Sequence, residues 1–344
     1  MKRFGKISAV LALTLSMMIV GACSNNNGGG NTAGNNGNAA GESAGNSGTK
    51  PAKSITLGFS QVGAESGWRS ANTTSIQDSA KEAGYTLKFS DAQQKQENQI
   101  KALRSFIQQK VDVIAFSPVV ESGWDTVLKE AKDAGIPVVL TDRAVDSKDT
   151  SLYVTFLGSD FVEEGRKAGQ WLSDQYKDAA EDINIVELQG TTGSAPANDR
   201  MQGFKEVISS NPKLKIIASQ TGDFTRAKGK EVMQAFLKAH KDIDVLYAHN
   251  DDMALGAIQA IEAAGLKPGE DIKIISVDAV KDGMQAASEG KINFIVECNP
   301  LLGPQLMKVV QDVVDGKTVE ARIVTEETTF TSEQAKEALP KRQY

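Results

Sequence analysis

The chain has 344 residues, 24% of them charged, with a formal net charge of −6 and two cysteines. An acidic surface repels phosphate groups, so the composition argues against a nucleic-acid-binding protein and against attachment to anionic lipid headgroups. Because Cys23 and Cys298 are the only cysteines and Cys23 has another predicted role, no disulfide within the chain is expected. The length exceeds that of one ordinary hydrophobic core and favours two lobes.

The N-terminus indicates export. Three basic residues precede an uncharged run, Ile7–Val20, that suits the core of a signal peptide and is too short for a helix spanning a membrane. The segment Val20-Gly21-Ala22-Cys23 resembles a bacterial lipobox, in which the cysteine is lipidated and becomes the first mature residue. We therefore expect residues 1–22 to be a lipoprotein signal peptide and Cys23 to anchor the protein to the outer face of the cell membrane. The alternative is an ordinary signal peptide cut nearby, with no role for Cys23.

Residues 23–53 are predicted to be a lipidated cysteine followed by a flexible tether. Between residues 24 and 49 the chain is almost entirely Asn, Gly, Ala, Ser and Thr, and Glu42 is the only charged residue. With no large apolar side chain to bury, such a segment cannot offset its ordering entropy. A Gly-rich coil of this length has a root-mean-square span of about 30 Å, which is enough to hold a domain away from a membrane.

From Ser54 onward, short runs rich in Val, Ile and Leu alternate with amphipathic segments at helical spacing. Nearly continuous apolar runs are typical of strands that are buried on both faces of a parallel sheet. Several helical segments end at a Gly, as at Gly84, Gly135 and Gly265, because Gly adopts the left-handed conformation without steric cost. The pattern predicts two series of strands, 55–60, 86–90, 111–117, 137–141 and 153–157, then 183–188, 215–219, 245–248, 273–277 and 293–297.

Two successive series of this kind predict an α/β protein with two doubly wound parallel-sheet lobes. A helix over 302–315 and one more strand over 322–328 suggest that the chain returns to the first lobe, so several segments should form the hinge. We expect the N-terminal lobe to comprise 54–158 and about 299–325, and the C-terminal lobe 159–298 and about 326–344. Ligands of such sheets bind beyond the carboxyl ends of the strands, which places the site in the cleft between the lobes.

Polar residues gather where the predicted strands end, in segments 60–69, 141–143, 199–200, 223–226, 249–253 and 277–278. Asp142 and Arg143 offer a carboxylate and a guanidinium side by side, and Asn250 can donate and accept with one amide. Sugar hydroxyls need both kinds of partner, and the apolar face of a sugar suits a flat ring such as Trp68 or, less surely, Phe224. These residue types in one cleft favour a sugar as ligand.

Structural interpretations compete with this one. Asp142 and Arg143 could form a simple ion pair in a loop, Asp278 could cap a helix, and Asp223 or Thr225 is expected at a helix N-cap. The remaining candidates are expected to pack or to serve the fold: Trp124, Trp171, His240, His249 and Cys298. No set of residues has metal-ligand spacing, so neither a metal nor a cofactor is expected. Glu297 lies near the predicted hinge, and strand alternation leaves open whether it faces a ligand.

Segments 58–63, 65–69, 93–101, 186–190, 222–226 and 247–253 follow a known pattern, and the likeness extends from Ser54 to about Thr331. In these segments the sequence resembles the galactofuranose-binding proteins of bacterial ABC importers. It departs from the family at residues 297–300 and in the lipobox and tether. The resemblance implies a type I periplasmic-binding-protein fold and ligand contacts at Glu65, Ser66, Gly67, Trp68, Arg69, Asp142, Arg143, Arg200, Asn250 and Asp278.

The resemblance implies a monomeric, exported receptor that closes around a monosaccharide, most closely galactofuranose, and delivers it to a membrane permease. Ribose, arabinose, galactopyranose and inositol are the alternative ligands, and a membrane sensor is the alternative partner. An enzyme is disfavoured, because no cofactor or nucleophile motif occurs where one would be needed. A sugar-responsive repressor would carry a DNA-binding headpiece where this chain has its signal segment, so export excludes it.

Overall fold

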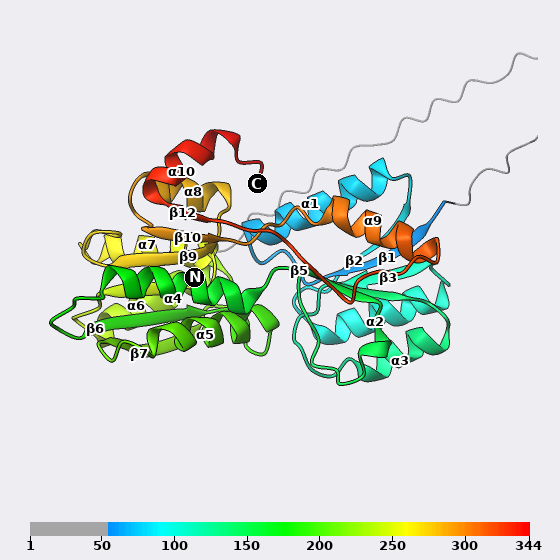
Figure 1. Cartoon of the computed structure of the whole chain (residues 1–344), viewed down its shortest axis with the longest axis horizontal. Helices are drawn as coiled ribbons and strands as arrows, with labels where there is room; N and C mark the ends of the chain where they lie inside the picture. Colours follow the sequence, from blue (N-terminus) through cyan, green and yellow to red (C-terminus); the bar gives the residue numbers. More distant parts are fainter. Residues whose placement is uncertain (1–53) are drawn as a thin grey trace, which may run out of the picture. The chain divides into compact units, whose positions relative to one another are not determined.

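Two six-stranded sheets organise the computed structural model, which describes residues 54–344 (Figure 1). The predicted signal peptide, the predicted lipidation site Cys23 and the predicted tether lie outside the described residues. Each sheet carries its own helices, and the protein therefore has a first lobe and a second lobe. No helix within residues 54–344 is long and apolar enough to cross a membrane.

The first lobe contains a fully parallel sheet with the strand order β11-β5-β4-β3-β1-β2. Its strands are β1 (Thr56–Gln61), β2 (Thr86–Asp91), β3 (Val113–Phe116), β4 (Val138–Thr141), β5 (Thr155–Gly158) and β11 (Arg322–Val324). Its helices are α1 (Gly67–Glu82), α2 (Gln96–Gln108), α3 (Asp125–Asp133), the short 3₁₀ helix η1 (Thr150–Leu152) and α9 (Gly303–Val314).

Alternation along the buried strands distributes the first-lobe core over both faces of the sheet. In β3, Val113 and Ala115 pack with residues of α1 and α9, whereas Ile114 and Phe116 pack with residues of α2 and α3. All four residues of β3 are buried, as expected for a central parallel strand. The edge strand β2 is buried on neither face. The sheet thus lies between two helical layers, with its strand ends free to present polar residues.

The second lobe repeats this plan with the strand order β12-β10-β9-β8-β6-β7, in which only the β10–β12 pair is antiparallel. Its strands are β6 (Ile183–Gln189), β7 (Leu214–Thr221), β8 (Val245–Ala248), β9 (Lys273–Asp278), β10 (Phe294–Glu297) and β12 (Thr329–Thr331). Its helices are α4 (Phe161–Gln175), α5 (Ala195–Ile208), α6 (Arg226–Ala239), α7 (Asp251–Ala263), α8 (Lys281–Ser288), α10 (Ser332–Ala338) and the 3₁₀ helix η2 (Leu339–Lys341).

All ten predicted strands of the two series are present, and the predicted fold class is confirmed. The single strand predicted over 322–328 is wrong. The structure has two short strands there, β11 in the first sheet and β12 in the second, separated by residues 325–328. The physical reason is that this segment passes from one lobe to the other, and its polar side chains contact the other connecting segments instead of continuing a strand ladder.

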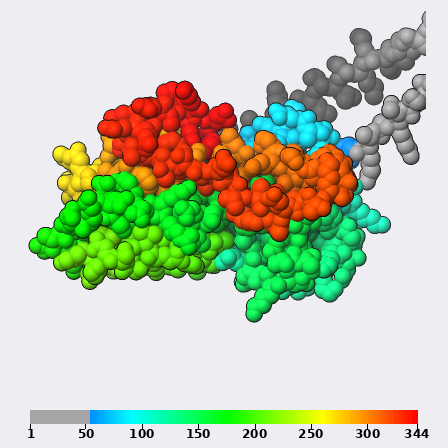
Figure 2. Space-filling view, in the orientation of Figure 1, coloured from blue at the N-terminus to red at the C-terminus, as the bar shows by residue number. Residues whose placement is uncertain are grey.

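Three segments connect the lobes: 159–160 between β5 and α4, 298–302 between β10 and α9, and 325–328 between β11 and β12. We call them crossings one, two and three. Figure 2 shows the last part of the chain, coloured orange to red, on the surface of both lobes. Because every crossing joins the same two sheets, the carboxyl ends of the strands of both lobes border a common cleft.

Candidate functional site

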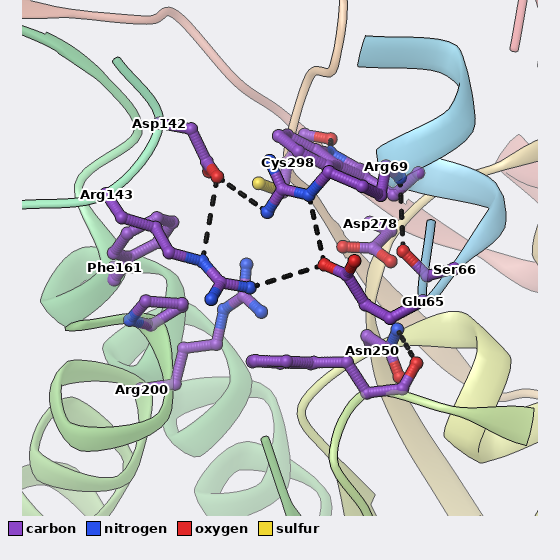
Figure 3. A pocket seen from close by; sticks show the side chains of 13 residues that line it. Glu65, Ser66, Arg69, Asp142, Arg143, Phe161, Arg200, Asn250, Asp278 and Cys298 are labelled. Carbon is purple, nitrogen blue, oxygen red and sulfur yellow. Dashed lines mark hydrogen bonds and ion pairs between the residues drawn. The ribbon is translucent and has the colours of Figure 1, made fainter. Parts of the chain in front are cut away.

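A cavity of about 280 Å³, part of it open to solvent, lies between the two lobes (Figure 3). Nine of the ten predicted ligand-binding residues line it, and Gly67 is the exception. The lining residues are Glu65, Ser66, Trp68, Arg69, Asp142, Arg143, Phe161, Pro196, Arg200, Phe224, Asn250, Asp278 and Cys298.

The start of α1 positions the first group of polar side chains. Ser66 is the N-cap of this helix, and its Oγ accepts a hydrogen bond from the Arg69 backbone N–H at 3.1 Å. This cap fixes the first turn, so that Arg69 points into the cleft and donates from Nε to Glu65 Oε1 at 3.0 Å. Trp68, on the same turn, donates from Nε1 to the Cys298 carbonyl oxygen at 2.6 Å and thereby connects the first lobe to crossing two.

Asp142 and Arg143 follow β4 and complete the network on this side. Asp142 has a φ of 65°, and its Oδ2 accepts from the Ser117 hydroxyl at 2.8 Å and pairs with Arg69 Nη2 at 2.7 Å. Arg143 lies 3.5 Å from Glu65 Oε1 and 3.7 Å from Asp142 Oδ2. Asp142 and Arg143 do form an ion pair, and both also belong to a buried set of two carboxylates and two guanidiniums.

The two arginines of this set occupy different electrostatic environments. Burial opposes the charge of Arg69, but Asp142 and Glu65 outweigh it and raise the pKa of its guanidinium. Burial lowers the pKa of Arg143 to about 10, with Arg69 as the second cause. Arg143 therefore carries a charge that its surroundings compensate only in part, and it has the most to gain from a new hydrogen-bond acceptor.

Arg200 enters the cavity from α5 of the second lobe. Its Nε donates to Glu164 Oε2 and its Nη1 to the His249 carbonyl oxygen, both at 2.6 Å. Burial alone would lower the pKa of Arg200, but the negative charge of Glu164 on α4 outweighs this effect, and the pKa is raised. The helices α4 and α5 come close enough for this bond because Gly165 and Gly203 have no side chains: a Cβ on Gly203 would lie 1.9 Å from the Val162 carbonyl oxygen.

Asn250 and Asp278 complete the second-lobe side of the cavity. Asn250 is the N-cap of α7 and accepts from the Met253 N–H at 3.0 Å, while its amide donates to the Phe224 carbonyl oxygen at 3.1 Å. One donor and one acceptor of this amide remain available for a ligand. Asp278 does not cap a helix, because Val280 is the N-cap of α8. Burial, with Asp251 as the next cause, raises the pKa of Asp278 well above its ordinary value, which favours a protonated carboxyl.

Three buried polar atoms of the lining residues have no hydrogen-bond partner: Glu65 Oε2, Arg143 Nε and Asp278 Oδ2. Buried polar groups are almost always paired in proteins, and each unpaired group costs about 1–3 kcal/mol. The three atoms come from both lobes and include a donor and acceptors. A ligand with several hydroxyl groups would satisfy them together.

Aromatic rings accompany the three arginines of the cavity. Arg69 lies over Trp68 at 4.6 Å, Arg200 over Phe161 at 5.0 Å, and Arg143 over Phe224 at 5.2 Å from the ring centroid. The Arg143–Phe224 contact crosses the cleft.

Sequence reasoning missed Phe161, Pro196 and Cys298 as lining residues. Phe161 follows the N-cap Asp160 directly after crossing one, and this position beside the hinge was the one signal that could have found it.

Direct contacts between the lobes show that the cleft is closed. Gly67, which does not line the cavity, donates its backbone N–H to Asp252 Oδ2 at 2.6 Å. At the other lip, Glu121 donates its N–H to the Gly193 carbonyl oxygen at 2.9 Å and accepts from Asn198 Nδ2 at 2.6 Å. Gly67 thus contributes to the contact between the lobes, and its predicted contact with a ligand stays a prediction.

The structure also locates residues that were expected to serve the fold or whose role was left open. Glu297 pairs with Arg342 at 2.7 Å and is not among the cavity residues. Trp124 and Trp171 pack on Phe116 and Phe294, and His249 is buried against Glu187 at 3.1 Å. Thr225 is the N-cap of α6.

One cluster of possible metal-binding donors occurs among residues 54–344: Glu164, Cys298 and Glu327, whose donor atoms lie within 4.8 Å of one another. Arg200 already supplies a positive charge to Glu164 in this cluster. The cluster lies next to the cavity, because both Arg200 and Cys298 line it.

Known proteins share this sequence and fold. Residues 57–318 match the periplasmic binding protein domain family. The galactofuranose-binding protein YtfQ of Escherichia coli strain K12 is 51% identical over 295 residues, which is 85% of this chain and 92% of that protein.

Two solved structures are similar in both sequence and fold. A Mycobacterium smegmatis protein in complex with β-D-fucofuranose is 65% identical with a TM-score of 0.83, over 85% of this chain and 96% of that one. The binding component of the arabinose ABC transporter from Shewanella sp. ANA-3, bound to α- and β-L-arabinofuranose, is 52% identical with a TM-score of 0.81, over 84% of this chain and 96% of that one.

Proposed function

We propose that this chain, which belongs to the periplasmic binding protein family, is the substrate-binding component of an ABC sugar importer and closes around one furanose sugar. The observation that carries the proposal is the set of buried atoms without a hydrogen-bond partner on Glu65, Arg143 and Asp278, residues that line one small cavity from both lobes. A ligand that contacts both lobes favours the closed form by its differential affinity for the two conformations.

Galactofuranose is the proposed ligand. The relatives reported above bind galactofuranose, β-D-fucofuranose and L-arabinofuranose, and these sugars have a five-membered ring in common. Fucofuranose lacks the 6-hydroxyl of galactofuranose, and arabinofuranose lacks carbon 6 altogether, so that its exocyclic chain is a single CH₂OH group. The charged groups of the cavity would therefore bind the ring hydroxyls, and the contacts with the exocyclic chain would select among the three sugars.

Each residue has a proposed role in this site. Glu65 and Asp142 accept hydrogen bonds from sugar hydroxyls, and Arg143 and Arg200 donate to their oxygens. Asn250 uses the free donor and acceptor of its amide, and protonated Asp278 donates from its carboxyl group. Trp68, Phe161 and Phe224 contact the C–H faces of the sugar. Ser66 and Arg69 hold this arrangement in place.

The finer cellular role is also a proposal. Residues 1–22 direct export, Cys23 carries the lipid anchor, and a monomer delivers its sugar to a membrane permease. The protein does not convert the sugar. Mass spectrometry of the mature protein would detect the lipid on Cys23, and a bound sugar recovered unchanged after prolonged incubation supports the absence of turnover.

A calorimetric titration of the purified protein tests the proposed ligand. Galactose should bind far more tightly than ribose, arabinose or inositol. Because galactose interconverts between its ring forms in water, carbon-13 NMR of labelled galactose in the complex should show the furanose form alone. A pyranose in the complex, or tighter binding of inositol, contradicts the proposal.

A further inference from the structure

The carboxyl group of Glu327 joins all three crossings. The Ser159 hydroxyl on crossing one donates to Glu327 Oε1 at 2.5 Å, and the Asn299 N–H on crossing two donates to the same oxygen at 2.8 Å. Glu327 itself lies on crossing three. A change in the angle between the lobes must bend these segments, so the surroundings of this carboxyl group depend on whether the cleft is open or closed.

Glu164 faces this junction from α4. Its Oε2 is bonded to Arg200, but its Oε1 is buried without a hydrogen-bond partner. Donor atoms of Glu164 and Glu327 lie within 4.8 Å of each other. Glu164 is buried and Glu327 is half-buried. Two carboxylates at this separation disfavour each other's ionisation, which favours neutralisation of one of them.

A proton neutralises the pair more simply than a metal ion does. Arg200 already supplies the positive charge for Glu164, and Glu327 Oε1 is already engaged by Ser159 and Asn299. A protonated Glu327 also supplies the donor that Glu164 Oε1 lacks. Burial, with Glu164 as the next cause, raises the pKa of Glu327 to about 9.

We propose that Glu327 is protonated in the closed form and donates a hydrogen bond to Glu164 Oε1. This carboxyl pair positions Arg200 for the sugar. The inference rests on the proposed function for its ligand. Glu164 and Glu327 are positioning residues: they act on the sugar through Arg200, which lines the cavity with its guanidinium held at Nε by Glu164.

The sign of the pH dependence follows from the two conformations. Opening the cleft hydrates Glu327, whose pKa then falls toward the ordinary value of about 4.3 for glutamate. Between that value and about 9, closing around the sugar takes up a proton. Affinity is therefore highest at low pH, declines as pH rises through this window, and is constant above it, with a limit of about tenfold per pH unit for one proton.

Other charged groups surround Glu327 and must be separated from its effect. Lys167 on α4 donates to its carbonyl oxygen at 3.2 Å, and Arg200 and Arg322 are the nearby cations. Cys298 on crossing two has a raised pKa because it is buried, and it stays neutral in this window. Asp278 and Asp251 also have raised pKa values, so the wild-type profile alone cannot identify Glu327.

The test compares the purified full-length protein with the variant Glu327→Gln and the matched control Glu326→Gln, whose side chain is exposed. Glutamine can donate to Glu164 Oε1 but cannot ionise. Calorimetry in two buffers of different ionisation enthalpy gives the affinity and the number of protons taken up. From pH 7 to 9, the affinity of wild type and of Glu326→Gln for the sugar should fall about tenfold or more, and both should take up protons on binding. The affinity of Glu327→Gln should fall clearly less, and the difference from wild type can reach about tenfold per pH unit.

A second variant tests the positioning of Arg200. Glu164→Gln removes the charged partner of Arg200 and should weaken sugar binding about tenfold at pH 7, because hydrogen bonds to charged groups are the stronger class. It should also flatten the pH profile, since no buried carboxylate then opposes ionisation of Glu327. Parallel pH profiles for wild type and Glu327→Gln, with equal proton uptake, would overturn the inference.

Proton uptake separates this inference from the proposed function, because it can be measured with whichever sugar binds. If galactofuranose does not bind but another sugar binds with a proton uptake that Glu327→Gln abolishes, the proposed ligand is wrong and the proton is correctly placed. If a sugar binds and wild type and Glu327→Gln take up the same number of protons, the proton is wrongly placed.

Discussion

The two lobes contribute to the cavity in different ways. On the first-lobe wall, Glu65, Arg69, Asp142 and Arg143 bond mainly to one another, with Arg69 bridging both carboxylates at 3.0 and 2.7 Å. On the second-lobe wall, Arg200, Asn250 and Asp278 are held separately. Arg200 bonds to α4, Asn250 caps α7, and Asp278 ends β9 with an unpaired oxygen.

This difference indicates that the first-lobe wall is arranged before the sugar arrives. A network of mutually bonded charges holds its shape without a ligand, whereas separately held groups are brought to the sugar by closure of the cleft. Substitutions in the first-lobe wall should therefore affect the fold as well as binding, and substitutions in the second-lobe wall mainly binding.

Arg69→Ala should have the largest effect. It leaves Glu65 and Asp142 buried without their main partner, and removal of one member of a buried ion pair costs about 3–5 kcal/mol. Chemical denaturation should show this loss in the free energy of unfolding, and sugar binding should be lost with it. A variant as stable as wild type would contradict the view that the network holds the wall together.

Arg143→Ala separates binding from stability within the same wall. Its surroundings lower its pKa to about 10, so the fold gains less from its charge than from that of Arg69. We expect affinity to fall at least about 100-fold, because charge-assisted hydrogen bonds to the sugar contribute about 1.5–3 kcal/mol each. The loss of unfolding free energy should be less than half that of Arg69→Ala. Unchanged affinity in calorimetry would refute the assignment of Arg143 to the site.

Asp142→Asn and Asp278→Asn compare one carboxyl group from each wall. Asp142 pairs with Arg69, so its amide variant loses a charge-assisted bond and should bind at least about 30-fold more weakly. Asp278 has a raised pKa and donates as an acid, a role that an amide can imitate, so its variant should lose about tenfold or less. Equal losses for both variants at pH 7 would show that the walls do not differ in this way.

Phe224→Leu tests the contact between the walls and should have the smallest effect. The ring lies 5.2 Å from the Arg143 guanidinium across the cleft. Cation–π contacts contribute about 0.5–2 kcal/mol, so affinity should fall about three- to tenfold. Because Phe224 also belongs to the second-lobe core, the unfolding temperature should fall as well. Phe89→Leu is a suitable control, because Phe89 lies on the edge strand β2 away from the cavity. The same loss in both variants would exclude a specific role for the contact.

Much of the fold could be predicted from the sequence, because buried parallel strands such as β3, β4 and β8 are short and nearly all apolar. The segment 322–328 could not, since its residues satisfy a strand pattern locally while the chain changes lobes between β11 and β12. Local periodicity does not reveal where a chain leaves one sheet for another.

The site was predictable where it coincides with the ends of strands and the first turns of helices, as for Arg69 and Asp142. Cys298 and Phe161 were missed because their place in the cavity depends on how crossings one and two run beside it. The pairing of Glu164 with Arg200 depends on the close approach of α4 and α5, and that of Glu327 with Ser159 on the path of the crossings. Contacts of this kind follow from the tertiary structure.

Calorimetric titration of the purified protein with labelled galactose, with carbon-13 NMR of the complex to identify the ring form of the bound sugar, tests the central claim most directly. The account predicts tight binding, loss of this binding in Arg143→Ala, and a furanose ring in the bound sugar. A pyranose ring in the complex, or affinity for galactose that survives Arg143→Ala, would contradict it.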